Sequence, residues 1–542
     1  MGKGVSKSLK FRELDISNKD VYDFIQHDPA QIMKVYSDRM APKLHMQQTF
    51  GTTNIEEITN NLRKIMQDAK VSTSVENAMI RDFVALHDRI TGVVIKNPDA
   101  LNQKIRRALT EVAQLSYLGT AGLASLTDFA KIVMEHNNRS LFKSLFSLID
   151  DQAITLNAKE GRLAGEILEI LNADSYLRFS ENVINNPFEN TSFSKFMAKT
   201  RNAFFFVNGL APITNIAKKF DSMIRVHETI ELAVKIKNKQ SIPKLDQEKL
   251  LRYGLDNKTM IEIADLVDKG VIEKTKVRKV AGQEVGGLYL GNSEEWIENG
   301  VSKSTLEKFR VSLNSGIQNT ILMGTPADKP IAVDGVFYVN KNLGKLFGLP
   351  EDKIVKGYSR LESGLGALPF QFYSYSFAAL NKITAGFAHG QQKNRVISVL
   401  AAMGLGYMGL KLKNIGRPYV MENMSVEDKI ARSFDMSGLA ALYTDLGYSA
   451  GAFMKDAVDY DAFDKLGINR KGPDGDLGDA ITTFTGAGTA WAYNILKGMK
   501  NFYDGNYDEA ASEFLGQTPF MNTLIGREIS KDIRNYVEKG RF

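Results

Sequence analysis

The chain has 542 residues, of which 43% are hydrophobic and 24% are charged, and 69 Lys and Arg against 63 Asp and Glu leave a formal charge of +6. This composition excludes a disordered tail, a collagen-like fibre and a dedicated nucleic-acid packaging protein, because the apolar content is ordinary and the excess charge is small for the length. The absence of cysteine excludes disulfides, cysteine-ligated zinc, iron–sulfur clusters and thiol nucleophiles.

Apolar residues that recur every three or four positions predict a mainly α-helical, multi-lobed protein. In segment 75–95, four apolar side chains are expected to form one stripe: Met79, Phe83, Leu86 and Ile90. Further helices are predicted at 98–118, 123–136, 162–171, 193–207, 213–236, 302–321, 370–388 and 396–412. Only 284–290 and 331–339 have the composition of strands, which could pair as a small β-ribbon near residues 284–339.

Composition and charge divide the chain into four predicted parts. These are an N-terminal helical region (1–110), a central helical domain with the small β element (111–355), an apolar, basic and acid-free helical segment (356–434), and an acidic, then mixed, helical region (435–542). The first 18 residues are polar and lack the apolar core of an export signal, so we expect synthesis in the cytoplasm.

The third part carries the clearest compositional signal. Between Glu362 and Glu422 there is no acidic residue, where the chain average predicts about seven. Six cations in this window are candidate contacts for DNA or anionic lipid: Lys382, Lys393, Arg395, Lys411, Lys413 and Arg417. Eight apolar or aromatic residues are candidate membrane contacts: Phe370, Phe372, Tyr373, Phe377, Val396, Leu400, Leu405 and Leu410.

The uncharged run 396–410 is shorter than the roughly 20 residues that a membrane-spanning helix needs. A buried core helix and a conditional, interfacial membrane segment both remain open. Gly404, Gly406 and Gly409 favour close helix packing in either case. They also spell GxGxxG, but without a preceding strand this pattern does not indicate a dinucleotide site.

No motif predicts an enzyme or a cofactor. Glu362 lies in an Arg-Leu-Glu-Ser-Gly sequence similar to the catalytic glutamate motif of lytic transglycosylases, but the glycine-rich element expected after it comes too early, at 366–371. A surface glutamate in a helix-initiating loop is the simpler interpretation. The six histidines are scattered, without metal-ligand spacing, and we expect solvated or capping roles for them: His27, His45, His87, His136, His227 and His389.

An ordered series of segments resembles the internal virion, or ejection, proteins of short-tailed bacteriophages and related helical modules of large polyvalent phage proteins. The segments are GLASLTD (122–128), FFVNGLAPITN (205–215), LRYGLD (251–256), GLYLGN (287–292), NTILMGTP (319–326) and PFQFYSYSF (369–377). The last is the most characteristic, and the resemblance covers roughly residues 110 to 400.

The resemblance implies a protein stored inside the capsid, ejected at infection, and used to carry phage DNA across the host cell envelope. Its implied partners are the portal, tail and other internal virion proteins, further copies of itself, phage DNA bound weakly and without sequence specificity, and conditionally the host membrane. Two alternatives stay open: a structural core protein of the particle without a membrane role, and a peptidoglycan-cleaving transglycosylase that uses Glu362. An exposed apolar surface within 370–412 favours the conduit, whereas complete burial favours the core protein.

Overall fold

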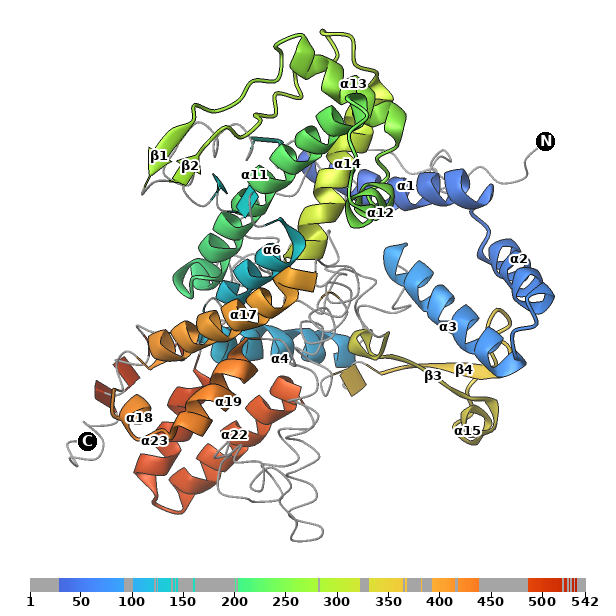
Figure 1. Cartoon of the computed structure of the whole chain (residues 1–542). Coiled ribbons are helices and arrows are strands. Elements are labelled where there is room, and N and C mark those ends of the chain that lie inside the picture. Colours follow the sequence, from blue (N-terminus) through green and yellow to red (C-terminus); the bar gives the residue numbers. More distant parts are fainter. Residues whose placement is uncertain are drawn as a thin grey trace. The chain divides into compact units, whose positions relative to one another are not determined.

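The computed structural model describes residues 29–91, 101–120, 123, 125–137, 140–141, 143–144, 159–160, 200, 203–280, 283–321, 331–363, 366–367, 382, 392–414, 418–437, 486–518, 521–523, 526, 529–530 and 532–533. The described part is mainly α-helical, which confirms the predicted fold class (Figure 1). The chain forms two compact units. Unit 1 comprises 1–94, 184–194 and 352–357, and unit 2 comprises the remainder.

Unit 1 contains α1 (Pro29–Phe50), α2 (Ile55–Asp68) and α3 (Thr73–Ile90). A buried ion pair joins α2 to α3, because Arg63 Nη1 lies 2.6 Å from Glu76 Oε1. The predicted apolar stripe of α3 is wrong about the buried face: Met79 is 54% exposed, whereas Ile80 is fully buried. Burial of the Glu76 side chain in its ion pair with Arg63 defines the inward face of this helix instead.

Unit 2 is built on the 28-residue helix α11 (Leu210–Lys237). Its other helices are α4 (Leu101–Tyr117), η3 (Leu118–Thr120), η4 (Ser125–Thr127), α6 (Asp128–Glu135), α12 (Lys244–Arg252), α13 (Asn257–Asp268), α14 (Lys303–Thr320), η6 (Ile331–Asp334), α15 (Lys341–Leu346), α17 (Gln392–Lys413), α18 (Pro418–Glu422), α19 (Val426–Met436), α22 (Gly486–Tyr503) and α23 (Tyr507–Gln517).

Helices α11, α13 and α14 enclose one hydrophobic core of unit 2. Asp256 and Ser302 fix the starts of α13 and α14, since each side chain accepts a hydrogen bond from the backbone N–H three residues on. Within this core the fully buried Trp296 packs on Phe309, with ring centroids 4.5 Å apart. A second cluster, which includes Phe220 of α11, joins α11 to α6 and α14.

Four short strands form two antiparallel pairs in the described part of unit 2. Strand β1 (Arg278–Val280) pairs with β2 (Gln283–Val285), and β3 (Val336–Asn340) pairs with β4 (Tyr358–Glu362). The two predicted strand segments therefore both contain β structure, but each finds its own local partner rather than the other. Short sequence separation favours such hairpin pairing over the longer pairing expected.

Candidate functional site

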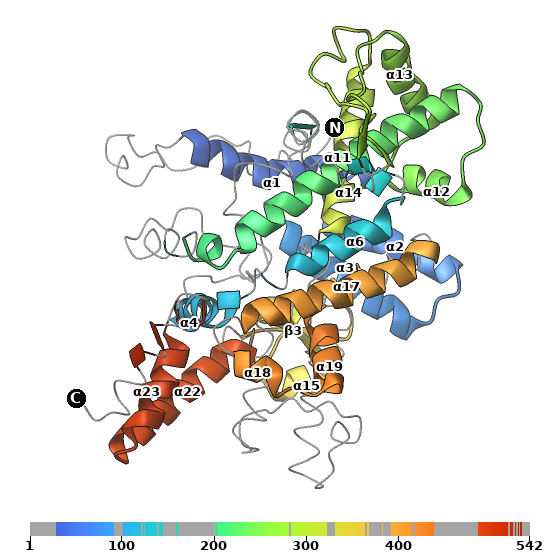
Figure 2. The ribbon, with the colours of Figure 1, turned by 60° about the vertical axis from the view of Figure 1, so that its left-hand side comes forward.

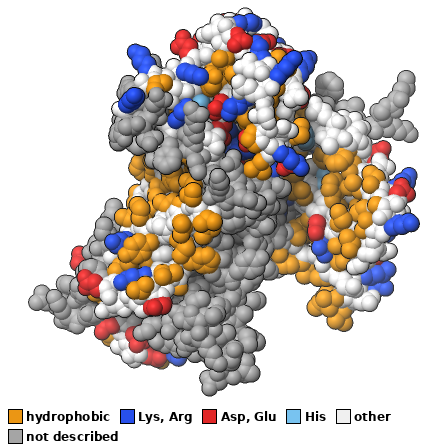
Figure 3. All heavy atoms as spheres, viewed as in Figure 1, with side chains coloured by type: hydrophobic (Ala, Val, Ile, Leu, Met, Phe, Trp, Pro, Cys, Tyr) orange, Lys and Arg blue, Asp and Glu red, His pale blue; other side chains and the backbone are white. Residues whose placement is uncertain are grey.

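Helix α17 exposes a continuous apolar face, which we call the α17 face. It consists of residues four apart along the helix: Val396, Leu400, Gly404, Met408 and Leu412. The side chains of Val396, Leu400 and Met408 are 65%, 64% and 52% exposed, and a Cβ added at Gly404 would meet no atom within 4 Å. Figure 3 shows hydrophobic side chains gathered over α17 and α19.

The opposite face of α17 packs inside unit 2, against α19 and α6 (Figures 1 and 2). Glycine is required at this contact: a Cβ on Gly406 would lie 2.1 Å from the carbonyl oxygen of Ser433 in α19. A Cβ on Gly409 would lie 3.1 Å from Met436. Small residues therefore bring the two helix backbones into close contact, as predicted for Gly406 and Gly409, whereas Gly404 lies in open space and takes no part in this packing.

Helix α19 adds a second exposed stripe in the same helix pair. Val426, Ile430 and Phe434 are four residues apart and 65%, 52% and 36% exposed. Both helices thus present apolar side chains to solvent while packing on each other. Exposed apolar patches of this kind usually mark an interaction surface, because monomeric proteins otherwise bury them.

Exposed cations follow the α17 face at its C-terminal end. Lys411 and Lys413 are exposed, and Lys411 Nζ lies 5.3 Å from the ring centroid of Tyr407. Lys393 and Arg395 belong to the first turn of α17, but their side chains lie outside the described residues. The described surface therefore combines apolar side chains with positive charge.

Two predicted contact residues have other positions. Lys382 is 6% exposed and donates hydrogen bonds to the carbonyls of Gln318 (2.6 Å) and Ile321 (3.3 Å) at the C-terminus of α14. It stabilises a helix end, where unpaired carbonyls favour a cation, so its prediction as a DNA or lipid contact is corrected. Leu410 is 4% exposed and belongs to the packed face of α17, which corrects its prediction as a membrane contact.

The remaining predicted contacts divide in two. Leu405 of α17 is partly buried. Outside the described residues lie Phe370, Phe372, Tyr373, Phe377 and Arg417. Among the helices that the structure describes, none combines the length and hydropathy needed to cross a bilayer.

A buried ionic cluster lies between α6, α11 and α12. His136 is fully buried, with Nε2 2.8 Å from Asp221 Oδ1 and Nδ1 2.8 Å from Glu228 Oε2. Arg225 Nε donates to Asp221 Oδ2 at 3.2 Å, and Lys249 Nζ lies 3.9 Å from Glu228 Oε2. The sequence did not reveal this cluster, because its residues are up to about 110 positions apart and show no spacing pattern.

The charged groups in this cluster stabilise one another's charged forms. Burial opposes the charged forms of His136, Asp221, Arg225 and Glu228, but the pKa of His136 is raised because Glu228 and Asp221 outweigh that effect. Despite burial, Arg225 and His136 lower the pKa of Asp221 to about 2, and His136 and Lys249 lower the pKa of Glu228 to about 2. The two carboxylates therefore favour the imidazolium form of the buried His136.

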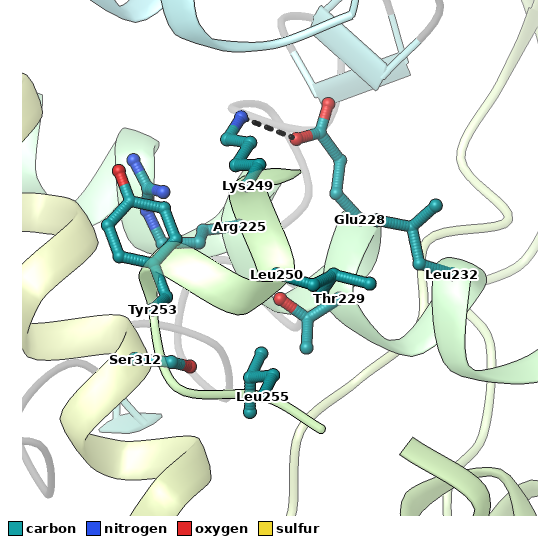
Figure 4. Close-up of a pocket in the computed structure, with 9 residues that line it drawn as sticks. All are labelled: Arg225, Glu228, Thr229, Leu232, Lys249, Leu250, Tyr253, Leu255 and Ser312. Carbon is teal, nitrogen blue, oxygen red and sulfur yellow. Dashed lines mark ion pairs between the residues drawn. The ribbon is translucent and has the colours of Figure 1, made fainter. Parts of the chain in front are cut away.

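The cluster borders a cavity of about 30 Å³, lined by Arg225, Glu228, Thr229, Leu232, Lys249, Leu250, Tyr253, Leu255 and Ser312 (Figure 4). This volume holds about one or two water molecules. The buried hydroxyl of Tyr253 has no hydrogen-bond partner among the described residues, and a water in this cavity would supply one. The size suits internal hydration of a structural ion network better than the binding of a substrate.

Other residues singled out in the sequence have structural positions. Glu362 lies in strand β4 opposite Val336, 3.3 Å from Arg360, rather than in a helix-initiating loop. His136 and His227 are buried at 0% and 2% exposure, so the expected solvated roles are wrong for these two. Within the described residues no group of His, Asp and Glu has the arrangement of a metal site. Comparisons with protein-family models, with curated proteins and with solved structures give no match.

Proposed function

We propose that the chain is an internal virion protein of a short-tailed bacteriophage, ejected at infection, that helps to form a conduit for DNA across the host cell envelope. The observation that carries this proposal is the α17 face, an exposed apolar stripe followed by exposed Lys411 and Lys413 within the acid-free window. Complete burial of α17 would instead have supported a structural core protein without a membrane role.

The chemistry of the α17 face suits an anionic bilayer surface. The apolar side chains that α17 exposes can enter the acyl boundary while Lys411 and Lys413 meet the headgroups. No spanning helix is needed for this first contact. Passage of DNA would follow from assembly of several copies, because a closed oligomer can satisfy polar groups that a lone chain cannot place in lipid.

A vesicle flotation assay tests the lipid contact directly. The face variant combines Val396→Ser, Leu400→Ser and Met408→Ser, and a matched control removes exposed apolar side chains elsewhere in unit 2 through Leu251→Ser, Val311→Ser and Leu346→Ser. Since each side chain of the face is already about half exposed, insertion should contribute about 1 kcal/mol per side chain, and the face variant should bind at least tenfold more weakly.

Vesicles of phosphatidylcholine with about a third phosphatidylglycerol are compared with pure phosphatidylcholine, and dye leakage is followed in parallel. Binding of the wild type and the control, with loss in the face variant, would support the proposal. Failure of the wild type to bind anionic vesicles at moderate salt, together with failure to oligomerise, would overturn it. Mass spectrometry of virions before and after DNA release provides the biological test, since an ejected protein must leave with the genome.

A further inference from the structure

A two-stranded antiparallel arm extends between α13 and α14, and we call residues 273–290 the basic ribbon. At its base the Leu290 N–H donates to the Glu273 carbonyl at 2.9 Å, and the Thr275 N–H donates to the Leu288 carbonyl at 2.8 Å. Lys274 lies opposite Tyr289 in an isolated bridge, and farther along the arm Lys279 of β1 lies opposite Glu284 of β2. Figure 1 shows β1 and β2 side by side at the end of this arm.

The first strand of the basic ribbon is rich in cations. Four occur within six residues, at Lys274, Lys276, Arg278 and Lys279, and the only acid from 274 to 287 is Glu284. Lys274, Lys276 and Lys279 are exposed, whereas Thr275 between the first two is buried. Lys276 precedes β1 and Lys279 lies within it, so the exposed lysines follow the first strand of the arm from its base outward.

The base of the basic ribbon is fixed to the core of unit 2. The Tyr289 N–H donates to Nδ1 of His227 in α11 at 3.1 Å, and Leu288 is fully buried in the second hydrophobic cluster. Gly286 and Gly287 have φ of +85° and +65°, and a Cβ on Gly286 would lie 2.2 Å from the carbonyl oxygen of Lys276. Glycine thus permits a local twist beside the lysines, as in a β-bulge.

We propose that the basic ribbon binds the phosphate backbone of duplex DNA. A two-stranded ribbon fits the major groove, which is about 12 Å wide and bounded by phosphates on both sides. Exposed lysines along the arm can reach the phosphates that border such a groove, and the base fixed to the core of unit 2 holds them there without a large ordering cost. The contact is electrostatic and independent of sequence.

The same chemistry argues against a lipid surface as the partner. Val277, at 60%, is the one large hydrophobic side chain exposed among those residues of the basic ribbon whose side chains the structure describes, whereas the α17 face combines several with its cations. The inference adds a DNA-binding surface to the proposed function. It rests on the proposed function only where it identifies the DNA as the genome being transported. It moves the expected DNA contact from the acid-free window to the ribbon.

Fluorescence anisotropy with a labelled 30-base-pair duplex of arbitrary sequence, from 50 to 200 mM NaCl, tests this proposal. The ribbon variant is Lys274→Gln, Lys276→Gln and Lys279→Gln. Its control loses the same charge at exposed positions elsewhere in unit 2: Lys258→Gln, Lys303→Gln and Lys345→Gln. Loss of three phosphate contacts should reduce the slope of log K against log salt by about 3, and weaken binding at least tenfold at 100 mM NaCl.

The control should change that slope by less than about 1. Absence of wild-type binding at 50 mM NaCl, equal slopes in the two variants, or tighter binding of a duplex RNA, whose major groove is too narrow for a ribbon, would overturn the proposal. Vesicle flotation of the ribbon variant and its control separates the DNA-binding proposal from the conduit proposal. If the ribbon variant loses DNA binding but still binds vesicles, the proposal of DNA binding by the ribbon is supported. If the wild type binds DNA but no vesicle, the conduit proposal is refuted and the proposal of DNA binding by the ribbon stands.

Discussion

Replacing His136 with Gln should destabilise unit 2, because the imidazole joins two buried carboxylates. Both ring nitrogens lie 2.8 Å from a carboxylate oxygen, and the side chain is fully buried. Removing one partner from a buried ion pair typically costs about 3–5 kcal/mol. Asp221 would keep Arg225 at 3.2 Å, and Glu228 would keep the Asn137 amide at 2.9 Å, so we expect the lower end, about 3 kcal/mol.

The effect of His136→Gln should depend on pH with a defined sign. Burial lowers the pKa of His136, but the two carboxylates overcome that effect and raise it above its ordinary value. A raised pKa means that the folded state holds a proton that the unfolded state releases above about pH 6.5. The stabilisation is therefore complete below that pH and is lost as the pH rises through the folded pKa. The difference between wild type and variant should be largest near pH 6 and smaller near pH 9.

Urea unfolding followed by Trp296 fluorescence measures this difference. Trp296 is fully buried in unit 2. Because the chain contains two tryptophans, adding Trp491→Phe to both the wild type and the His136→Gln variant leaves Trp296 as the only indole. The exposed His45 provides a control through His45→Gln. A loss below 1 kcal/mol at pH 6, or a loss that is the same at pH 6 and pH 9, would refute a buried imidazolium at position 136.

Three further predictions concern packing and acid stability. Gly406→Val should lower the free energy of unfolding by about 2–3 kcal/mol, because a Cβ at this position would lie 2.1 Å from a backbone oxygen of α19. Gly404→Ala, in open space, should be neutral or slightly stabilising. Thermal unfolding followed by circular dichroism compares the two variants. Gly316→Ala should cost about 1–3 kcal/mol, since its Cβ would lie 2.5 Å from the guanidinium of Arg225, and unchanged urea unfolding would contradict this. The pKa of Glu228 is lowered to about 2, so its contribution to the free energy of unfolding should be present above about pH 4.3 and lost as the pH falls through 2. Glu228→Gln should therefore make the free energy of unfolding less dependent on pH when it is measured between pH 5 and pH 2.

The sequence predicts helices better than it predicts the faces they bury. The predicted segment 213–236 corresponds to α11 at 210–237, and 396–412 to α17 at 392–413. The buried face of α17 could not be deduced, because apolar residues and glycines occur on both sides of that helix. Only the close approach of Ser433 shows that Gly406 lies inward and Gly404 outward.

The buried ions escaped prediction for a different reason. His136, Asp221 and Glu228 each look like ordinary polar residues on helices, and nothing local shows that the end of α6 and α11 bring them together. Lys382 likewise carries no sign that it serves the end of α14 rather than a solvent-exposed surface. A charged residue in a sequence is expected to be exposed to solvent, and this expectation fails where a residue distant in the sequence supplies a partner.

The exposed or predicted contact cations discussed above therefore occupy three environments in the described part of the chain, and the residues around each cation distinguish these environments. Lys382 lies among helix-terminal carbonyls and stabilises the fold. Lys411 adjoins exposed apolar side chains, a combination that favours an anionic bilayer. Lys276 and Lys279 are exposed on an arm where Val277 is the one large apolar side chain described as exposed, a combination that favours the hydrated phosphates of DNA. The proposed conduit would contact both DNA and an anionic bilayer, and separate surfaces of these two compositions would allow either contact to be lost while the other is retained.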